Sequence, residues 1–315
     1  MGSAGTMTLQ HAEWSPYAVE PSGSRFPCRL PHLGTGDGVI LALVLAGVGW
    51  FVWRAGDVAG YEWQWGLVLE FLVRATPSGW EPGLLVRGFG VTLRLGVWSM
   101  LLALVLGGLL GVLSAHKRGC AALPVQCYVN LIRNTPPLVL LFLIYFFAGN
   151  LLPIVELEAL IRSLPAPVQA ACATLFAPEG QLDRMLAAVL TLGIYEGAYV
   201  AEIVRGGVES VHRAQWEASA ALGFSRFEQL WLVILPQARQ AVVPPLAGQT
   251  ISTFKDSALA SLISLPELTF QSLEVMAVSR MTFEVWISAG TLYLLLGSAC
   301  ARYARWLEQR SVGGA

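Results

Sequence analysis

Long, almost uninterrupted runs of apolar residues dominate the pattern of hydrophobic and polar positions along this chain. Five of these runs are apolar on all sides rather than on one face, as expected of a helix that lies within a membrane. Each is long enough for the roughly 17 to 25 residues that a spanning helix needs. A backbone in lipid must satisfy its own hydrogen bonds, so helices are the expected structure. The predicted spans cover residues 91–114, 128–152, 182–204, 241–265 and 283–303.

A shorter apolar run at residues 39–53 precedes these five. It ends in aromatic residues, which favour the membrane interface, and Arg54 follows it directly. We interpret it as a leading transmembrane helix, with a signal anchor that only sets topology as the alternative. Residues 1–38 lack the apolar block of a cleavable signal peptide, so they are expected to form an N-terminal tail.

Composition agrees with a membrane protein. Hydrophobic residues make up 55% of the 315 residues and charged residues only 13%, against about 25% charged in an ordinary globular domain. The predicted fold class is an all-α integral membrane protein with one leading helix and a five-helix core. The net charge of −1 gives no sign of a nucleic-acid surface. The predicted parts are an N-terminal tail at 1–38, a leading helix and outer loop at 39–84, a core at 85–309 and a C-terminal tail at 310–315.

The positions of lysine and arginine set the expected orientation, because these residues resist transfer across a membrane. If the N-terminal tail lies inside, the loops on that side carry most of the basic residues, including Lys117, Arg118, Arg205 and Arg213. We therefore expect a multi-pass protein of the cell inner (plasma) membrane with both termini in the cytoplasm.

The sequence shows no pattern of catalytic or metal-binding residues. Its five cysteines and four histidines are scattered and have no metal-ligand spacing, and neither HExxH nor GxSxG occurs. The G-x-x-x-x-G-K-[ST] loop that binds nucleotide phosphates is missing as well. We therefore expect no enzyme activity, no metal and no bound cofactor in this chain.

The loop between the third and fourth core spans, residues 213–236, has the pattern of a helix, a turn and a second helix. Residues 216–222 are good helix formers, and Gly223 is the residue type most able to adopt the left-handed conformation that stops a helix. Ser225 and Glu228 then have the S-x-x-E spacing of a capping box. The second helix carries an apolar face made of Phe227, Leu230, Trp231 and Ile234.

Two interpretations of this loop are open from the pattern alone. The second helix can pack beneath the bundle as an ordinary interfacial helix. Alternatively, its small alanines and glycine turn can let a partner protein approach closely and dock. In both interpretations Pro236 is expected to interrupt the helix where it meets the membrane.

The run EASAALGFSRFEQLWLVILPQA within this loop resembles the EAA loop of ABC transporter permeases. Ser219 stands where the family normally has alanine and Val233 where it has isoleucine, and both replacements are small or similar in shape. The resemblance implies a coupling helix that fits a cleft in a cytoplasmic ATP-binding subunit. The positions that match the motif are Glu217, Ala218, Gly223, Leu235 and Pro236.

Four further segments resemble the polar amino-acid (histidine/glutamine-type) branch of these permeases, over about residues 85–309. They are TLRLGVWSMLLALVLGGLLGVLS, RNTPPLVLLFLIYFF, YEGAYVAEIVRGGVESV and FKDSALASLISLPELT. The resemblance implies the core of a type I ABC importer permease, surrounded by membrane lipid. It also implies a second permease subunit, same or different, an ABC ATP-binding subunit that holds ATP and Mg, and an extracytoplasmic amino-acid-binding protein.

Polar residues inside the predicted spans are candidates for a substrate path, because ionisable groups in a membrane are costly and usually face a cavity or a partner. Glu196 and Tyr199 lie within the third core span, and Lys255, Asp256 and Ser257 lie in the fourth. An opposed cation and anion would suit the carboxylate and ammonium of an amino acid. Structural bonds to neighbouring helices are the alternative for each of them.

Two other polar groups have a structural interpretation first. Glu202 and Arg205 have the i, i+3 spacing of an ion pair that closes the inner end of a helix. Pro136 and Pro137 suit the first turn of a helix, and Arg133 before them suits a membrane anchor, with a gating role as the alternative. The resemblance to the polar amino-acid branch implies the permease subunit of an ATP-driven importer for polar or charged amino acids. The alternative is a non-energised channel or scaffold.

Overall fold

The computed structural model describes residues 63–77, 79–116, 123–151 and 153–312, together with isolated positions between 39 and 61. The chain divides into two units, Met1–Glu62 and Trp63–Ala315. In the first unit, the described positions of the predicted leading helix are helical and have exposed side chains, as at Trp50 and Trp53. The predicted N-terminal tail at 1–38 lies outside the described residues, as do residues 313–315 of the predicted C-terminal tail at 310–315. Residues 310–312 of that tail are instead the last residues of the helix Thr282–Val312.

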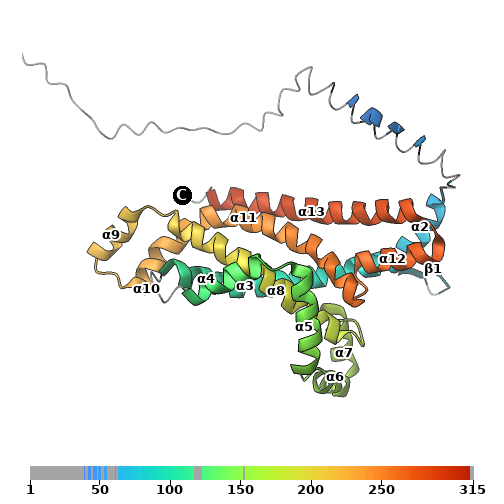
Figure 1. The fold of residues 1–315 in the computed structure, drawn as a ribbon, viewed down its shortest axis with the longest axis horizontal. Coiled ribbons are helices and arrows are strands. Elements are labelled where there is room, and N and C mark those ends of the chain that lie inside the picture. Colours follow the sequence, from blue (N-terminus) through green and yellow to red (C-terminus); the bar gives the residue numbers. More distant parts are fainter. Residues whose placement is uncertain are drawn as a thin grey trace, which may run out of the picture. The chain divides into compact units, whose positions relative to one another are not determined.

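The second unit is built of helices, apart from one short hairpin (Figure 1). The hairpin pairs β1 (Val73–Thr76) antiparallel with β2 (Gly79–Pro82) in a stretch expected to be an outer loop. The helical segments are α2 (Trp65–Leu72), α3 (Leu84–His116), α4 (Leu123–Arg133), α5 (Pro137–Leu151), α6 (Ile154–Ser163), α7 (Ala166–Leu175), α8 (Leu182–Glu209), α9 (Arg213–Ala221), α10 (Arg226–Glu228), η2 (Gln229–Ile234), α11 (Leu235–Asp256), η3 (Ser257–Ile263), α12 (Leu268–Ser279) and α13 (Thr282–Val312).

Helices α3 and α8 form the centre of this unit, and glycines let their backbones approach closely. A Cβ atom on Gly107 would lie 2.5 Å from the carbonyl oxygen of Gly197, and one on Gly111 would lie 2.6 Å from that of Ala201. Small residues at such crossings allow the close packing that stabilises helix pairs in lipid. Helix α11 packs against both α8 and α13, which completes the parallel part of the bundle seen in Figure 1.

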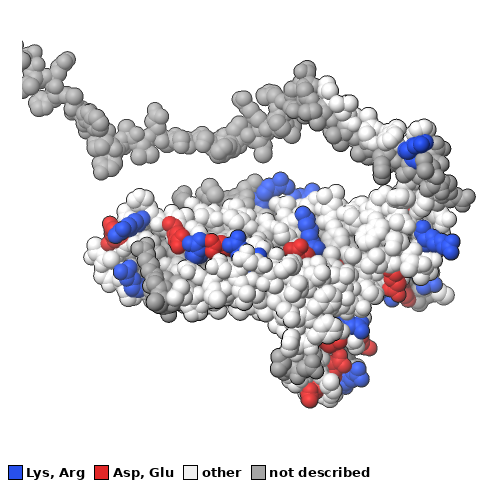
Figure 2. All heavy atoms as spheres, in the orientation of Figure 1, with Lys and Arg blue, Asp and Glu red and all other residues white. Residues whose placement is uncertain are grey.

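By length and composition, three described helices can cross a membrane, namely α3, α8 and α13. A fourth span results if α4 and α5 are counted together. With α11, these elements form the predicted all-α, five-helix core. Figure 2 agrees with burial in a membrane, because much of the surface of this unit that it shows is uncharged, while charged side chains gather around α9, around α6 and at the end that carries the hairpin.

The predicted second core span at residues 128–152 is not one straight helix. It breaks between Arg133 and Pro137, and the two halves meet at 105°. Pro137 begins α5, as expected for a proline in the first turn of a helix. A residue that precedes proline is also disfavoured in the α conformation, which ends α4 before Pro136. Helix α5 therefore projects away from the parallel bundle (Figure 1).

The predicted fourth core span at residues 241–265 is wrong at both ends. Helix α11 starts earlier, at Leu235, and the α-helix stops at Asp256. The tighter 3-10 segment η3 follows and ends at Ser264, whose φ of 59° is left-handed. Prolines 244 and 245 lie inside α11 without ending it.

A buried carboxylate ties three helices together at the end of the bundle that carries the hairpin. Glu267 precedes α12 and caps it, because its Oε1 accepts from Phe270 N at 2.8 Å and its Oε2 from Thr269 N at 2.9 Å. Oε2 also accepts from the hydroxyls of Thr92 on α3 and Tyr293 on α13. Buried polar groups need such partners, so this set of bonds fixes α12 against both helices.

Candidate functional site

The loop at residues 213–236 folds largely as its sequence predicts. Helix α9 begins after His212, whose Nδ1 accepts from Ala214 N at 3.2 Å. It ends at Ala221, and Gly223 follows with a φ of 84° in the left-handed region. The predicted glycine turn is therefore confirmed.

The predicted capping box is present at the start of the second helix. Glu228 N donates to Ser225 Oγ at 3.3 Å, and Ser225 N donates to Glu228 Oε2 at 2.7 Å. Hydrogen bonds from the side chain and the backbone of Ser225 lower the pKa of Glu228 below its ordinary value. The expected interruption at Pro236 is wrong, because η2 passes directly into α11 and the proline occupies the first turn of α11, where a missing N–H costs little.

The apolar face of the second helix is divided between core and surface. Leu230 and Ile234 are buried in a cluster with Val208 and Ala238. Phe227 and Trp231 are 69% and 55% exposed, as are their neighbours Leu222 at 76% and Leu232 at 64%. We call these four exposed residues, Leu222, Phe227, Trp231 and Leu232, the coupling surface. Half of the face packs beneath the bundle, as the first interpretation of this loop expects, and half is left uncovered, so docking of a partner stays a prediction.

The matched motif residues are distributed around this surface. Glu217 is exposed and pairs with Arg213, with Oε1 3.0 Å from Nε. Ser219 is buried and donates from Oγ to the Trp216 carbonyl, so its small size suits the interior. Their neighbours are placed as follows: Ala218 and Pro236 are exposed, and Val233 and Leu235 are half-buried against the cluster around Ile234.

Two acidic residues predicted as path candidates meet inside the bundle. Glu196 on α8 is fully buried, and it interacts electrostatically with Asp256, the last residue of α11. Gln249 of α11 donates its amide to Glu196 Oε2. Glu196 Oε1 has no hydrogen-bond donor among the described residues. Gln249 was missed from the sequence, although it lies seven residues before Asp256 and therefore on the same helix face.

Two tyrosines on α8, Tyr195 and Tyr199, flank Glu196 along the helix. The hydroxyls of Tyr195 and Tyr199 lie 3.2 Å apart, and both side chains are partly exposed. The guanidinium of Arg133 sits over the ring of Tyr199 at 5.1 Å from its centroid. This contact links the break between α4 and α5 to α8, and nothing in the sequence predicts it. We call Tyr195, Glu196, Tyr199 and Asp256 the acidic cluster.

The other two path candidates do not join the acidic cluster. The Lys255 side chain is exposed, and none of the ion pairs in the described part of the chain includes it. Ser257 is fully buried, and its hydroxyl donates to the carbonyl of Phe254 at 2.7 Å. Lys255 and Asp256 point in different directions, as expected of adjacent residues on a helix, and a path role for Lys255 or Ser257 stays a prediction.

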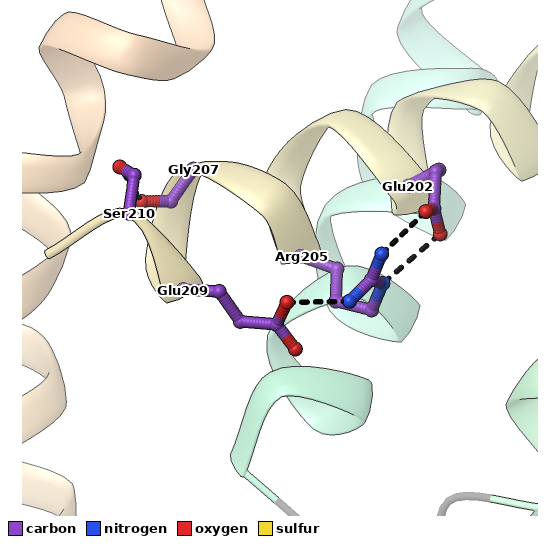
Figure 3. A network of polar contacts seen from close by, with 5 residues as sticks. All are labelled: Glu202, Arg205, Gly207, Glu209 and Ser210. Atoms are coloured by element: carbon purple, nitrogen blue, oxygen red, sulfur yellow. Dashed lines mark hydrogen bonds and ion pairs between the residues drawn. The ribbon is translucent and has the colours of Figure 1, made fainter.

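The last turns of α8 carry an ion-pair network, shown in Figure 3. Arg205 Nε donates to Glu202 Oε2 at 3.0 Å, and its Nη1 donates to Glu209 Oε2 at 2.6 Å. The predicted Glu202 to Arg205 pair is therefore confirmed. The Arg205 side chain is only partly exposed. Just beyond the network, the hydroxyl of Ser210 donates to the carbonyl of Gly207 at the end of α8, before the chain enters α9.

Comparison with known proteins identifies this arrangement. Residues 103–312 match the family described as binding-protein-dependent transport system inner membrane component. The chain belongs to this permease family. It is 33% identical to the glutamine transport system permease protein GlnP of Escherichia coli (strain K12), over 72% of this chain and 92% of that protein. It is 30% identical to the octopine transport system permease protein OccM of Rhizobium radiobacter, over 72% of this chain and 88% of that one.

Solved structures agree with the permease fold. A structure titled as an amino acid ABC transporter with histidines superposes with a TM-score of 0.58 at 26% identity, covering 72% of this chain and 94% of that chain. The MetNI methionine ABC transporter in an inward-facing conformation gives a TM-score of 0.55 at 20% identity, which supports the fold alone. The permease is thus an ABC importer subunit of the inner membrane, and the predicted family and fold class are confirmed.

Proposed function

We propose that this permease imports polar or charged amino acids, driven by ATP that a separate ABC ATP-binding subunit holds with Mg and hydrolyses. The observation that carries the proposal is the coupling surface, where four large apolar side chains remain exposed beside the EAA motif. Contiguous exposed apolar side chains commonly mark a protein interaction site. Relatives named for glutamine and octopine transport support an amino-acid substrate.

The remaining partners follow from the same proposal. The coupling surface lies in the cytoplasm with both termini, and an extracytoplasmic amino-acid-binding protein delivers substrate to the hairpin end of the bundle. A second permease subunit, the same chain or a different one, completes the pathway. The permease itself contributes no catalytic residue and binds no cofactor or metal, so its chemistry is conformational gating.

Within the bundle, the acidic cluster belongs to the substrate path. Glu196 and Asp256 are ionisable groups inside or at the end of helices of the core, where such groups are costly unless they serve a cavity or a partner. Tyr195 and Tyr199 line the neighbouring part of α8 and are partly exposed. A substrate that crosses the bundle along α8 therefore meets two aromatic rings and two carboxylates.

Affinity purification in mild detergent tests the proposal. The tagged wild-type permease is compared with a double variant, Glu217→Lys with Gly223→Val, and with the matched charge reversal Glu274→Lys on the exposed part of α12. We expect an ATP-binding subunit to co-purify with the wild type and the α12 variant and to be lost from the double variant. Absence of the ATPase from the wild type in several detergents would instead favour a channel or scaffold.

A further inference from the structure

A cavity of about 260 Å³ lies between α6, α7 and the link to α8. Its floor is apolar and continuous with the core of the bundle, because Ala177 and Leu182 are buried there and Ile161 and Phe176 pack against that core. The volume is slightly below the roughly 300–1,000 Å³ of pockets for drug-sized ligands. The cavity therefore suits a molecule of the size of a single small metabolite.

Charged side chains of both signs line the rest of the cavity. They are Glu158 and Arg162, one turn apart on α6, and Glu179 in the link before α8. Glu158 and Arg162 form only a loose ion pair, with Oε2 and Nη2 3.7 Å apart, which is beyond hydrogen-bonding distance. The other ion pairs in the described part of the chain include neither of them. Both charged groups therefore keep hydrogen-bonding capacity for a ligand.

Helix α3 holds the wall that α7 contributes to the cavity. Arg94 Nη1 donates to the carbonyl of Ala173 at 2.6 Å, and Trp98 Nε1 donates to that of Leu175 at 2.9 Å. The ring of Trp98 also packs edge-on against Phe176, with the ring centroids 5.6 Å apart. A cation at the last carbonyls of a helix is favourable. The wall is thus fixed before any ligand arrives, which lowers the cost of binding.

The cavity is separate from the acidic cluster. Leu182 lines the cavity at the first residue of α8, and Glu196 follows after about 21 Å of helix at 1.5 Å per residue. Helix α8 then continues to α9, so the cavity lies at the end of α8 away from the coupling surface. In the proposed orientation of the permease, this is the extracytoplasmic end.

The charges and the floor together match a free amino acid. Its ammonium and carboxylate are attached to one carbon atom, so a carboxylate and a guanidinium on one side of the cavity can bind both groups at once. Its side chain then lies on the apolar floor.

We propose that this cavity is an entry site for an amino acid, in which Arg162 binds the carboxylate and Glu158 binds the ammonium. The inference rests on the proposed function and adds to it a second substrate site, outside the path along α8. Both side chains are accessible there, since Arg162 is exposed and Glu158 is partly exposed.

Protection of Cys172 from a thiol reagent tests the proposal, because this half-buried free cysteine lines the cavity. The permease complex in phosphatidylcholine nanodiscs reacts with N-ethylmaleimide while L-glutamine, L-glutamate or L-arginine is present, and peptide mass spectrometry measures the labelling. We expect at least one of them to protect Cys172 saturably, with half-protection at about 1 mM or below. Labelling of the exposed Cys127 on α4 should not change.

Matched variants and analogues assign the contacts. Arg162→Gln and Glu158→Gln should each raise the half-protecting concentration about tenfold or more, the order of one charge-assisted hydrogen bond. Glu156→Gln removes an exposed carboxylate of the same helix that does not line the cavity and should have no effect. The amide and the N-acetyl derivative of the protecting amino acid, which lack the carboxylate and the ammonium, should both protect poorly. Glu196→Gln should leave protection unchanged.

Absence of protection by all three amino acids overturns the inference, as does equal protection by the two derivatives. So does loss of protection in Glu196→Gln, because binding in the path along α8 would then act on Cys172 from a distance. Protection by O-phosphoethanolamine and by none of the amino acids would assign the cavity to a lipid headgroup. A complex that keeps its ATPase but shows no protection loses the entry site and keeps the importer function, whereas absence of the ATPase counts against the importer function.

Discussion

Gly223 provides the sharpest test of how the coupling loop is built. Its φ of 84° is left-handed, and a Cβ placed on it would meet no atom within 4 Å. Substitution here therefore perturbs the backbone conformation and creates no clash in the isolated subunit. The left-handed conformation costs about 1–2 kcal/mol for an ordinary L-residue, and a β-branched residue there is a genuine outlier. Asparagine is the exception, because it tolerates this conformation at helix ends.

The free-energy cost predicts a graded series at this position. About 1–2 kcal/mol corresponds to a roughly 5- to 30-fold loss of the correctly turned loop. We expect Gly223→Asn to stay close to wild type, Gly223→Ala to lose ATPase retention by about fivefold or more, and Gly223→Val to lose most of it. Gly206→Ala is the matched control, since Gly206 lies inside α8 with no atom within 4 Å of its Cβ position and no left-handed φ.

Two assays on the series separate local from global effects. ATPase retention and uptake-coupled ATP hydrolysis in proteoliposomes report the loop, and the thermal midpoint of the purified permease reports the bundle. The midpoint should change little, because Gly223 is exposed and touches no core residue. The reasoning is refuted if Gly223→Val couples as well as wild type. It is also refuted if Gly223→Asn fails as badly as Gly223→Val, since side-chain size, rather than backbone conformation, would then decide the outcome.

Three further predictions follow from the same structure. Gly107→Leu should separate α3 from α8 and lower the free energy of unfolding by about 1–3 kcal/mol, as is typical of overpacking, and the thermal midpoint should fall with it. Gly108→Leu, with open space around its Cβ position, should leave the midpoint unchanged. Trp231→Ala should leave the midpoint unchanged, because the side chain is 55% exposed, and reduce ATPase retention in the same preparation. Bonds from Ser225 lower the folded pKa of Glu228, so the capping box stabilises the loop above the unfolded pKa and loses this effect as pH falls through the lowered value. The protection factor of the Ser225 amide, which donates to the Glu228 carboxylate, should therefore fall on acidification in wild type and be independent of pH in Glu228→Gln.

The coupling loop shows how far local sequence signals reach. The glycine turn and the capping box depend on residues within three positions of one another, and both are present as predicted. The interruption expected at Pro236 was wrong because the rule on proline applies to a helix interior. The π-helical segment η2 places the proline instead in the first turn of the next helix.

Contacts between distant elements were beyond the sequence. The prolines after Arg133 predicted a helix start, but the 105° bend between α4 and α5 depends on what α5 packs against. Asp256 and Lys255 were expected to offer opposite charges, yet adjacent residues on a helix point in different directions. Which of them faces Glu196 depends on how α11 is rotated against α8, and no local pattern encodes that rotation.

The loop that carries the coupling surface joins the two helices that carry the acidic cluster. Helix α8 bears Glu196 and leads into α9, while η2 bears Trp231 and continues without a break into α11, which ends at Asp256. A partner that moves the coupling surface therefore moves the helix that holds one acid relative to the helix that holds the other, unless α8 and α11 shift together. Gly207 of α8 packs closely on Val242 of α11, so the two helices are in direct contact along the part that joins the loop to the cluster. Spin labels on α8 and α11 beside the cluster should change separation when a non-hydrolysable ATP analogue is added to the complex, and an unchanged separation would exclude this route of coupling.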